Sequence, residues 1–398
     1  MSAGFERRGR AAVLVGVLAA IAIVVGTGIL VVTRDDDGDD GSGGSPVIEP
    51  PPVSVVVGPE VEEVTPVDPE KGTRSGSPLD ELPPDVRVLA DFGQRPGWSP
   101  DGEQLVFLDD SPLGEVWTVE VETGETRNLT GDFEHRGFAR AYYLSNGDLL
   151  LCGPTSGPAP STEQPEAGRF TGVMSVLRAP FDEAPEPLGM PCWEGIATSA
   201  SSMRIAWNRS DIDYTDADLA GRVINGITEI WTGEVRDVDG QAAILNPRKV
   251  LDRDAFGMLA VFEVQDFRPP SDDELLFTAY AYQGGEVFGI DLETGAVRNY
   301  SNSSAYEEVE GVDTTGDTVY VERDLEYGGI DPGPLDVWRL GLDDGKWERV
   351  TFFNRWAPYY ASNPTVSPNG ELLAFQLSFD GETEGQGEGI LVLDLGRA

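Results

Sequence analysis

The sequence predicts an all-β protein: a six-bladed β-propeller of four-stranded blades over residues 85–398, preceded by one transmembrane helix and a disordered linker. Three observations predict this fold. A turn followed by an apolar run recurs six times at intervals of about 50 residues. An alternating strand that ends in a Gly turn recurs with it, and 48 glycines and 29 prolines favour turns over helices. A few-stranded sheet is marginal alone in water, so each unit needs its neighbours to bury its apolar side chains.

The N-terminal segment predicts a membrane anchor. Residues 1–10 carry three arginines and are expected to be a short cytoplasmic terminus, and residues 11–33 contain no charge and are long enough to span a bilayer as a helix. A cleaved signal peptide is the alternative, but its apolar core is usually about 7 to 15 residues long, and no convincing cleavage site follows this one. Acidic residues after the span place the N-terminus inside and everything beyond it outside. We therefore expect a single-pass signal anchor in the cytoplasmic membrane, with the propeller on the extracytoplasmic side.

The composition changes after the anchor. Residues 34–84 are rich in Asp, Glu, Gly, Ser and Pro, with few large apolar residues that could repay the entropy of ordering. They predict an acidic Pro/Gly-rich linker that acts as a partly extended tether. Within it, Val53 to Val57 could pair as a short strand.

Two sequence marks define the repeats. Three segments share an aromatic residue, a Gly turn and an Arg at nearly the same places: Trp117–Thr130, Phe288–Ser301 and Trp338–Thr351. The turn with its apolar run occurs six times, in Ser99–Phe107, Ser145–Leu151, Ser201–Trp207, Ser271–Phe277, Thr315–Val321 and Ser367–Phe375. The last unit ends with its third strand, Ile390–Leu395, and Val86–Leu89 stands unassigned before the first unit. We expect Val86–Leu89 to supply the missing strand and close the ring, which leaves no open edge.

The best-preserved units carry a specific resemblance. The pattern Trp98-Ser-Pro-Asp-Gly102 with Leu105 and Phe107, and its C-terminal counterpart Ala361–Phe375, resemble the WD40-like repeat of the TolB family of six-bladed propellers. The resemblance covers roughly residues 85–398. It implies either a non-catalytic scaffold outside the cytoplasmic membrane or the propeller half of a larger enzyme. The predicted anchor and acidic linker depart from the periplasmic member of that family.

Charge and residue content exclude several classes of function. The formal charge is 28 − 70 = −42, which argues against binding to nucleic acid or to an anionic membrane surface. The chain has one histidine, His135, and lacks a nucleophile elbow, a phosphate-binding loop and a Cys-x-x-Cys motif. We therefore predict no enzyme, no catalytic residue and no cofactor. The expected function is a protein or ligand interaction module whose partner is another envelope protein or a glycan.

Candidate binding residues fall into two groups. Loops that join an outer strand to the next inner strand, or a second strand to a third, lie on one face, and long insertions there often bind ligands. Three insertions are expected on that face: Gly153–Thr171, Asn208–Gly226 and Asp324–Pro334. The aromatic cluster with Arg355, Trp356, Tyr359 and Tyr360 is also expected there, exposed for protein or glycan recognition, or packed between blades. The inner strands are expected to bring four polar residues to the rim of the central channel: Arg140, Asp266, Arg268 and Asn363.

The remaining candidates concern disulfides and metals. Cys152 and Cys192 should both reach the predicted binding face, and the extracytoplasmic side permits oxidation, so we expect a disulfide, with two free thiols as the alternative. No metal site is predicted. The acidic loop from Asp211 to Asp218 could bind Ca²⁺ weakly, but its spacing does not match an EF-hand and a solvated loop is favoured. The alternative function is a hydrolase or lactonase with a metal in the channel, held by Asp266, Glu310 and Asn363.

Overall fold

The computed structural model describes residues 55–56, 67–109, 113–155, 168, 171–211, 226–255, 260–280, 282, 284–326, 332–380 and 387–396. The chain divides into two units, residues 1–47 and 48–398, and the described residues all belong to the second. The predicted cytoplasmic terminus and the anchor at residues 11–33 therefore lie outside the described residues. Within the described ranges, no helix has the length and apolar character needed to cross a membrane.

Strands β2 to β25 form six blades of four antiparallel strands. Four blades are separate sheets, whereas the fourth and fifth are joined into one sheet by a parallel pair between β17 and β19. The first three blades consist of β3 (Gln94–Trp98), β4 (Gln104–Leu108), β5 (Val116–Glu120) and β6 (Thr126–Asn128); β7 (Arg140–Tyr143), β8 (Leu149–Pro154), β9 (Gly172–Leu177) and β10 (Glu186–Cys192); and β11 (Ile196–Thr198), β12 (Arg204–Ser210), β13 (Thr228–Val238) and β14 (Gln241–Asp252). The last three consist of β15 (Val261–Phe267), β16 (Glu274–Tyr280), β17 (Gly285–Asp291) and β18 (Val297–Asn299); β19 (Tyr306–Val312), β20 (Thr318–Asp324), β21 (Asp336–Gly341) and β22 (Trp347–Arg349); and β23 (Tyr359–Val366), β24 (Leu372–Phe379), β25 (Gly387–Asp394) and β2 (Val86–Ala90). Three short 3₁₀ helices, η1 (Pro78–Glu81), η3 (Arg253–Ala255) and η4 (Phe353–Trp356), complete the described elements.

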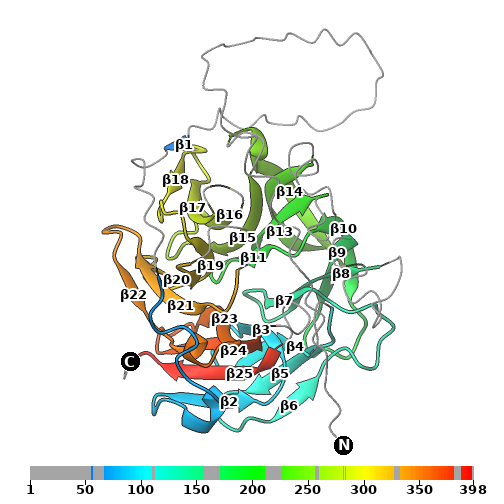
Figure 1. Cartoon of the computed structure of the whole chain (residues 1–398). Helices are drawn as coiled ribbons and strands as arrows, with labels where there is room; N and C mark the ends of the chain where they lie inside the picture. Colours follow the sequence, from blue (N-terminus) through cyan, green and yellow to red (C-terminus); the bar gives the residue numbers. More distant parts are fainter. Residues whose placement is uncertain are drawn as a thin grey trace, which may run out of the picture. The chain divides into compact units, whose positions relative to one another are not determined.

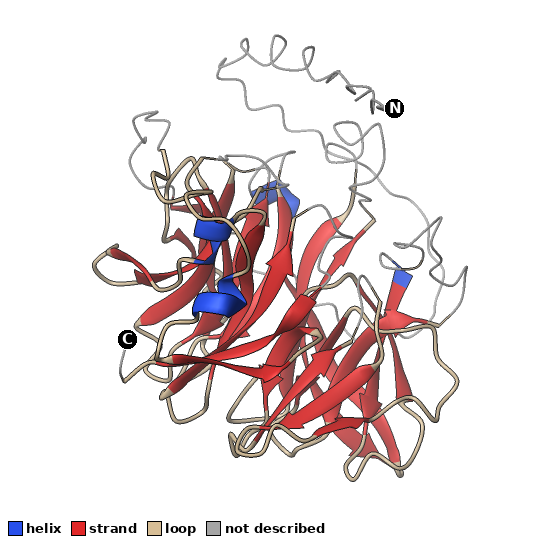
Figure 2. Ribbon diagram, turned by 60° about the horizontal axis from the view of Figure 1, so that its bottom comes forward, coloured by secondary structure: helices blue, strands red, loops and turns tan. Residues whose placement is uncertain are grey.

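The six blades form a closed ring around a central axis (Figure 1). Each innermost strand, from β3 through β7, β11, β15, β19 and β23, contacts the next, and β23 contacts β3 again. The ring is sealed by the predicted strand, because β2 pairs antiparallel with β25 through Val86 and Leu393. Strand order and ring closure together define a six-bladed β-propeller, which confirms the propeller part of the predicted fold but not the transmembrane helix before it. Figure 2 shows that strands dominate the described structure.

The hydrophobic core lies between the faces of neighbouring blades. The largest cluster joins Ala206 and Ile230 of the third blade to Phe262 and Phe277 of the fourth. The two phenylalanine rings meet edge to face, with centroids 5.6 Å apart. Because both faces of each sheet are covered by neighbours, the central strands are apolar along most of their length rather than strictly alternating.

A recurring hydrogen-bond pattern explains the shared residues of the repeats. In three blades, a hydroxyl at the end of the outer strand accepts a hydrogen bond from a backbone N–H of the third strand at 2.9 Å: Thr130 from Val116, Ser301 from Val287, and Thr351 from Val337. An acidic residue just before each of those donors pairs with the outer strand, as Glu286 does with Asn299. The repeated Ser or Thr is therefore a structural tie rather than a binding residue.

Residues 67–84 pack against the propeller, so the linker prediction is wrong for this part of its range. Asp68, which is 8% exposed, accepts hydrogen bonds from Arg349 at 3.1 Å and from Asn354 at 2.9 Å. Lys71 forms an ion pair with Asp324 at 3.1 Å. The segment was assigned to the linker because it has few apolar residues, but it is held by ion pairs and hydrogen bonds instead. Upstream, β1 (Val55–Val56) pairs in parallel with β18.

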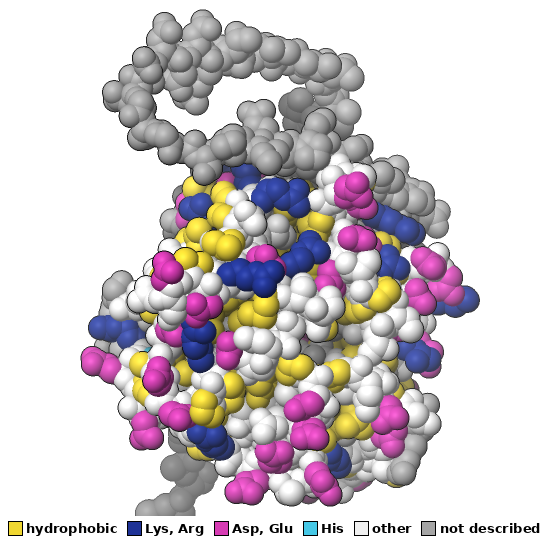
Figure 3. Space-filling model, turned by 180° about the vertical axis from the view of Figure 1, so that it is seen from behind, with side chains coloured by type: hydrophobic (Ala, Val, Ile, Leu, Met, Phe, Trp, Pro, Cys, Tyr) yellow, Lys and Arg dark blue, Asp and Glu magenta, His cyan; other side chains and the backbone are white. Residues whose placement is uncertain are grey.

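The acidic composition is visible on the surface. Figure 3 shows acidic side chains spread over one face, with basic side chains lying among them. Many of the basic groups are engaged locally, as in the pair between Arg268 and Glu274 at 2.8 Å. Within the described residues, the excess carboxylates are therefore interspersed with basic groups rather than gathered in one segment.

The contacts of Asp68 lead to a first prediction. Asp68→Ala removes the acceptor of the Asn354 side-chain amide and one of the two carboxylates that pair with Arg349, which keeps Asp336, so the free energy of unfolding is expected to fall by about 1–3 kcal/mol. Thermal or urea unfolding measures the change. The matched control is Asp80→Ala, since Asp80 is exposed in the same segment. Equal stability of the two variants would contradict the structural role of residues 67–84.

Candidate functional site

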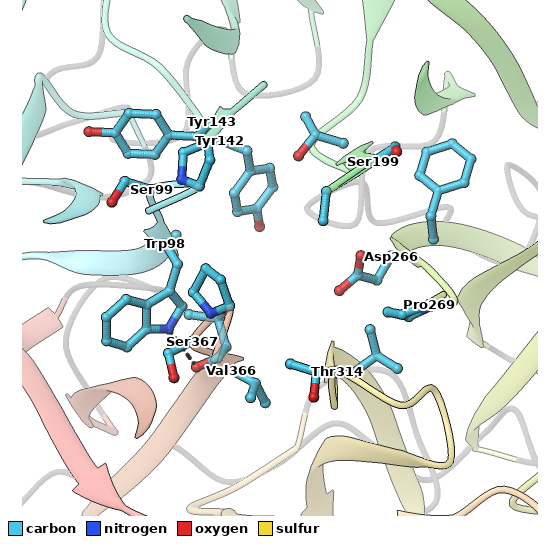
Figure 4. A pocket seen from close by; sticks show the side chains of 18 of the residues that line it. Trp98, Ser99, Tyr142, Tyr143, Ser199, Asp266, Pro269, Thr314, Val366 and Ser367 are labelled. Atoms are coloured by element: carbon cyan, nitrogen blue, oxygen red, sulfur yellow. Dashed lines mark hydrogen bonds between the residues drawn. The ribbon is translucent and has the colours of Figure 1, made fainter. Parts of the chain in front are cut away.

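A pocket of about 400 Å³ opens on the propeller axis, and all six blades contribute to its wall. It lies at the C-terminal ends of the innermost strands and at the turns that lead into the second strands. Figure 4 shows Tyr142 and Asp266 pointing into it from opposite sides. Its walls are mostly apolar and include Pro96, Trp98, Leu144, Phe267, Val312 and Val366. A cavity of this kind, with a few convergent polar groups, is the usual form of a small-ligand site.

The repeated turns shape the mouth of the pocket. In the Ser-Pro-Asp-Gly turn of the first blade, the Ser99 hydroxyl accepts the backbone N–H of Gln104 at 2.9 Å, and Gly102 adopts a φ of 74° that suits glycine. Ser367 and Gly370 repeat this arrangement in the sixth blade. The Trp98 indole donates to the carbonyl of Thr365 at 3.0 Å, which ties the two blades together beside the pocket. The most conspicuous sequence motif therefore builds the rim.

Four of the six inner strands have irregular pairing where they line the pocket. The register shifts between Val264 and Asp266 in β15, and between Val309 and Gly311 in β19. Similar irregularities occur in β3 and in β23, where Asn363 has a φ of 50°. A bulge re-aims the extra side chain. In this way Gln265, Glu310 and Asn363, which fall within the irregular segments, come to line the pocket.

Two buried side-chain atoms of pocket residues have no hydrogen-bond partner among the described residues. Gln265 is 7% exposed, and among the described residues nothing bonds its amide nitrogen Nε2. Within the same ranges, the buried Oε1 atom of Glu310 also has no hydrogen-bond partner. Unsatisfied buried polar atoms are costly in a folded protein. Because both residues line the pocket, a donor and an acceptor without partners lie in its wall, and small side-chain movements would present them to a ligand.

Two carboxyls of the pocket, Asp266 and Glu310, have raised pKa values. Burial raises the pKa of Asp266 to about 8, and the negative charge of Asp272 adds to the shift. Burial, reinforced by Glu308 and Glu322, places the pKa of Glu310 well above its ordinary value. Both carboxyls are therefore poised to change charge when a cation arrives.

A buried polar network lies deeper along the axis. Arg140, which is 3% exposed, donates to Glu194 at 3.0 Å and to Glu263 at 2.9 Å, and thereby joins the second, third and fourth blades. Arg95 also bonds Glu194, and its backbone N–H donates to Gln376 of the sixth blade at 2.7 Å. These ion pairs and hydrogen bonds therefore connect neighbouring blades around the axis.

The fourth, fifth and sixth blades complete this network. The Tyr280 hydroxyl lies 2.9 Å from Oε2 of Glu263 and also contacts Glu308, which the Tyr306 hydroxyl reaches as well. Glu322 accepts from the side-chain amide of Asn363 at 2.8 Å. Because a hydroxyl has one proton, the two contacts of Tyr280 require one of the carboxyls to carry a proton of its own.

Carboxyl groups outnumber arginines in the described part of the axis, and this excess favours protonation of some of the carboxyls. In the described part of the axis, five glutamates (Glu194, Glu263, Glu308, Glu310 and Glu322) face two arginines, Arg95 and Arg140. Burial raises the pKa of Glu263, Glu308 and Glu322 to about 7 each, and repulsion between the carboxylates adds to the shift. The axis therefore holds ionisable protons near neutral pH.

The four channel residues predicted from the sequence have different fates. Asp266 and Asn363 line the pocket, and Arg140 belongs to the network beneath it. Arg268 does not line the pocket, so its assignment to the rim is wrong. Its guanidinium donates to Glu274 at 2.8 Å and to the carbonyl of Gly316 at 2.6 Å, and it braces the fourth blade against the fifth.

The predicted aromatic surface is also wrong in its main feature. Trp356 is 8% exposed, and the guanidinium of Arg74 covers its ring at 4.7 Å. Arg355 pairs with Glu70, which belongs to the same covering segment. Tyr359 packs edge to face on Phe379 with centroids 4.8 Å apart, and Tyr360 packs against a buried cluster. Residues 67–84, assigned to the linker, cover part of this cluster, and the pocket opens at the opposite ends of the inner strands.

Cys152 and Cys192 form the expected disulfide, with sulfur atoms 2.09 Å apart. Cys152 lies in β8 and Cys192 ends β10, so the bond spans β9 within the second blade. Gly172 of β9 makes room for it, because a Cβ there would lie 2.8 Å from Sγ of Cys152 and 3.0 Å from Sγ of Cys192. The bond fixes the outer edge strand to the blade.

The remaining sequence candidates are only partly described. Most of the three predicted insertions lies outside the described residues, as does the acidic loop after Asp211. Within the described ranges, no group of three His, Cys, Asp or Glu side chains has an arrangement suited to a metal ion. The three residues named for the alternative metal site, Asp266, Glu310 and Asn363, nevertheless line the same pocket.

Sequence reasoning missed most of the axial network, including Arg95, Glu194, Glu263, Glu308 and Glu322. One signal was available. Acidic residues interrupt otherwise apolar inner strands, as in Tyr306-Glu-Glu-Val-Glu310, where Tyr306, Glu308 and Glu310 alternate and so share one side of the strand. Read as an inner strand, this pattern would have placed carboxyls on the axis.

Comparison with known proteins finds distant structural similarity only. No protein-family model matches the chain, and no curated protein matches it in sequence. Among solved structures, a putative TolB from Agrobacterium tumefaciens is 13% identical with a TM-score of 0.45, over 67% of this chain and 78% of that one. TolB from Acinetobacter baumannii is 11% identical with a TM-score of 0.46, over 79% and 66%. A gluconolactonase from Xanthomonas campestris is 15% identical with a TM-score of 0.49, over 85% and 98%. Similarities this distant do not indicate what the chain binds or whether it catalyses a reaction.

The shared protons of the axis lead to a prediction about pH. The pKa of Glu308 is about 7 in the folded protein and lower in the unfolded chain, so the folded state binds the proton more tightly. Its stabilising effect is therefore present in acid and is lost as the pH rises through about 7. Glu308→Gln keeps the shape of the protonated acid without the titration. We expect its melting temperature to fall less than that of the wild type between about pH 5 and about pH 8.

The control for this experiment is Glu371→Gln, which removes the same charge at an exposed position. Its melting profile should follow that of the wild type, because general repulsion in so acidic a chain affects both proteins alike. If Glu308→Gln and Glu371→Gln have the same pH profile, the axial carboxyls do not hold protons in the way described.

Proposed function

We propose that this protein is a non-catalytic binding module that is anchored in the cytoplasmic membrane by residues 11–33 and recognises its ligand in the axial pocket. The observation that carries the proposal is the pocket of about 400 Å³, which all six blades line and which has unpartnered polar atoms at its floor. Among the described residues nothing bonds these atoms, so a ligand is a suitable partner for them. The site therefore fits recognition better than structural packing.

Two features support the extracytoplasmic location. The Cys152–Cys192 disulfide suits an oxidising compartment, since structural disulfides are rare in the cytoplasm. The uncharged segment at residues 11–33 follows three arginines and precedes an acidic run, which favours export of everything after it. The proposed partner is accordingly a component of the envelope, either a protein or a glycan, that presents a small group to the pocket.

Blocking the mouth tests the proposal. Thr314 is exposed and lines the pocket, so Thr314→Trp should narrow the entrance without disturbing the core. A set of small-molecule fragments is screened by saturation-transfer NMR against the wild type. Fragments that bind should lose at least about tenfold in affinity for Thr314→Trp, which corresponds to about 1.4 kcal/mol.

The matched control is Thr123→Trp, an exposed substitution in a turn of the first blade that does not line the pocket. It should bind the same fragments as the wild type. Fragment binding that is unchanged in Thr314→Trp, or no fragment binding at all, would reject the pocket as the recognition site.

A metal-dependent hydrolase or lactonase is the second candidate, and one observation favours it. Asp266, Glu310 and Asn363 come from three blades and line one pocket, so two carboxyls and an amide could face a common ion. Titration with Ca²⁺ or Zn²⁺ tests this function. A rise in melting temperature that is lost in Asp266→Asn would support it, and an unchanged melting temperature would count against it.

A further inference from the structure

The chemistry of the pocket indicates one class of ligand. Among the described residues that line it, Asp266, Glu310 and Asp313 are acidic and none is Lys, Arg or His. The arginines nearest the floor are already engaged, because Arg140 bonds Glu194 and Glu263 and Arg95 bonds Glu194. A ligand that enters the pocket therefore meets carboxyls with no cation among the lining residues, although the charge of Arg140 in the network opposes part of the rise in the pKa of Glu310.

The unpartnered atoms refine this picture. Glu310 offers a buried oxygen without a hydrogen-bond donor, and the amide nitrogen of Gln265 has no acceptor among the described residues. Gln265 is 7% exposed, so bulk water does not satisfy that nitrogen. A ligand that satisfies both must bring a donor and an acceptor close to each other.

The walls define the rest of the ligand. Trp98 and Tyr142 give the space aromatic walls, and Pro96 and Val312 give it aliphatic ones. Phe267 lies behind them, because it is 2% exposed and the guanidinium of Arg204 lies over its ring at 5.1 Å. Figure 4 shows the Tyr142 ring and the Asp266 carboxyl facing the same space from opposite walls. Aromatic faces attract organic cations and also pack against apolar groups. A hydrated metal ion would leave these walls unused.

We propose that the axial pocket binds an organic ammonium ion that carries a hydrogen-bond acceptor next to the amine and an apolar or aromatic body. The ammonium group bonds Asp266 and Glu310, the acceptor takes the amide of Gln265, and the body packs on Trp98 and Tyr142. This inference rests on the proposed function, since it names the ligand class of the same pocket. A small free amine and the N-terminus of a peptide share this chemistry.

Three probes of nearly equal shape test the inference. Phenylalaninol carries the ammonium group, a hydroxyl and a phenyl ring; its diol analogue replaces the amine with a hydroxyl; and phenyllactate carries a carboxylate instead. Calorimetry at about pH 8.5, above the pKa of about 8 to which burial raises Asp266, gives their affinities for the full chain. Phenylalaninol should bind at least about tenfold more tightly than the diol, and phenyllactate should bind most weakly.

Charge-removing variants assign the effect to the named carboxyls. Asp266→Asn and Glu310→Gln should each weaken phenylalaninol binding by about tenfold and leave binding of the diol within about twofold. Both variants remove a buried ionisable group without changing its shape, so the fold is expected to survive, and melting curves verify this. The matched controls Asp317→Asn and Glu371→Gln remove the same charges at exposed positions outside the pocket and should bind like the wild type.

The outcomes separate the two proposals. If the diol binds as tightly as phenylalaninol and Thr314→Trp abolishes both, the pocket remains a binding site but cation recognition is rejected. If phenyllactate binds best, or if none of the probes binds, cation recognition is rejected as well. Binding that is insensitive to Thr314→Trp rejects the proposed function itself.

A dipeptide amide with N-terminal phenylalanine distinguishes the two sources of the ligand. Tighter binding than phenylalaninol indicates a peptide terminus, and weaker binding indicates a small amine. Either result supports cation recognition.

Discussion

The ion pairs of Arg140 are the interaction on which the centre of the propeller depends. Its guanidinium is buried on the axis and joins Glu194 of the third blade to Glu263 of the fourth. A buried charge is tolerated only when it is paired, so the position of Arg140 dictates where carboxylates must lie. Carboxyls still outnumber arginines among the described axial residues, and the surplus groups keep protons and bond Tyr280 and Tyr306 instead. The axis is thus held together by shared protons as well as by ion pairs.

The pocket is the point at which this network meets the solvent. The first and sixth blades share the same turn at the rim, whereas irregular pairing in four inner strands, β3, β15, β19 and β23, places different side chains at the floor. Glu310 belongs to both regions, because it lines the pocket and its pKa is raised by Glu308 and Glu322 of the network. A cation bound at Glu310 would therefore also change the protonation of Glu308 and Glu322 in the network. Regular repeats supply the scaffold, and departures from the repeat supply the chemistry.

The sequence was sufficient for the fold but only partly sufficient for the site. Repeated turns and alternating strands are local signals, so the six blades and the closing strand Val86–Ala90 could be predicted. The site depends on bulges, which shift a side chain from one side of a strand to the other without a distinctive residue pattern. Asp266 and Asn363 were recognised as polar residues in apolar surroundings, but Arg268, in an equally suggestive position, turns away to Glu274. The aromatic cluster around Trp356 was misjudged because the segment that covers it, residues 67–84, has the composition of a linker.

A crystal structure of the protein with phenylalaninol tests the central claim most directly, because it locates the ligand and its polar contacts together. The account predicts that the ammonium nitrogen lies within hydrogen-bond distance of Asp266 or Glu310, with the phenyl ring against Trp98 or Tyr142 and all six blades around it. Density for the amine elsewhere on the propeller, or in the pocket with the ammonium group turned away from both carboxyls, would contradict it.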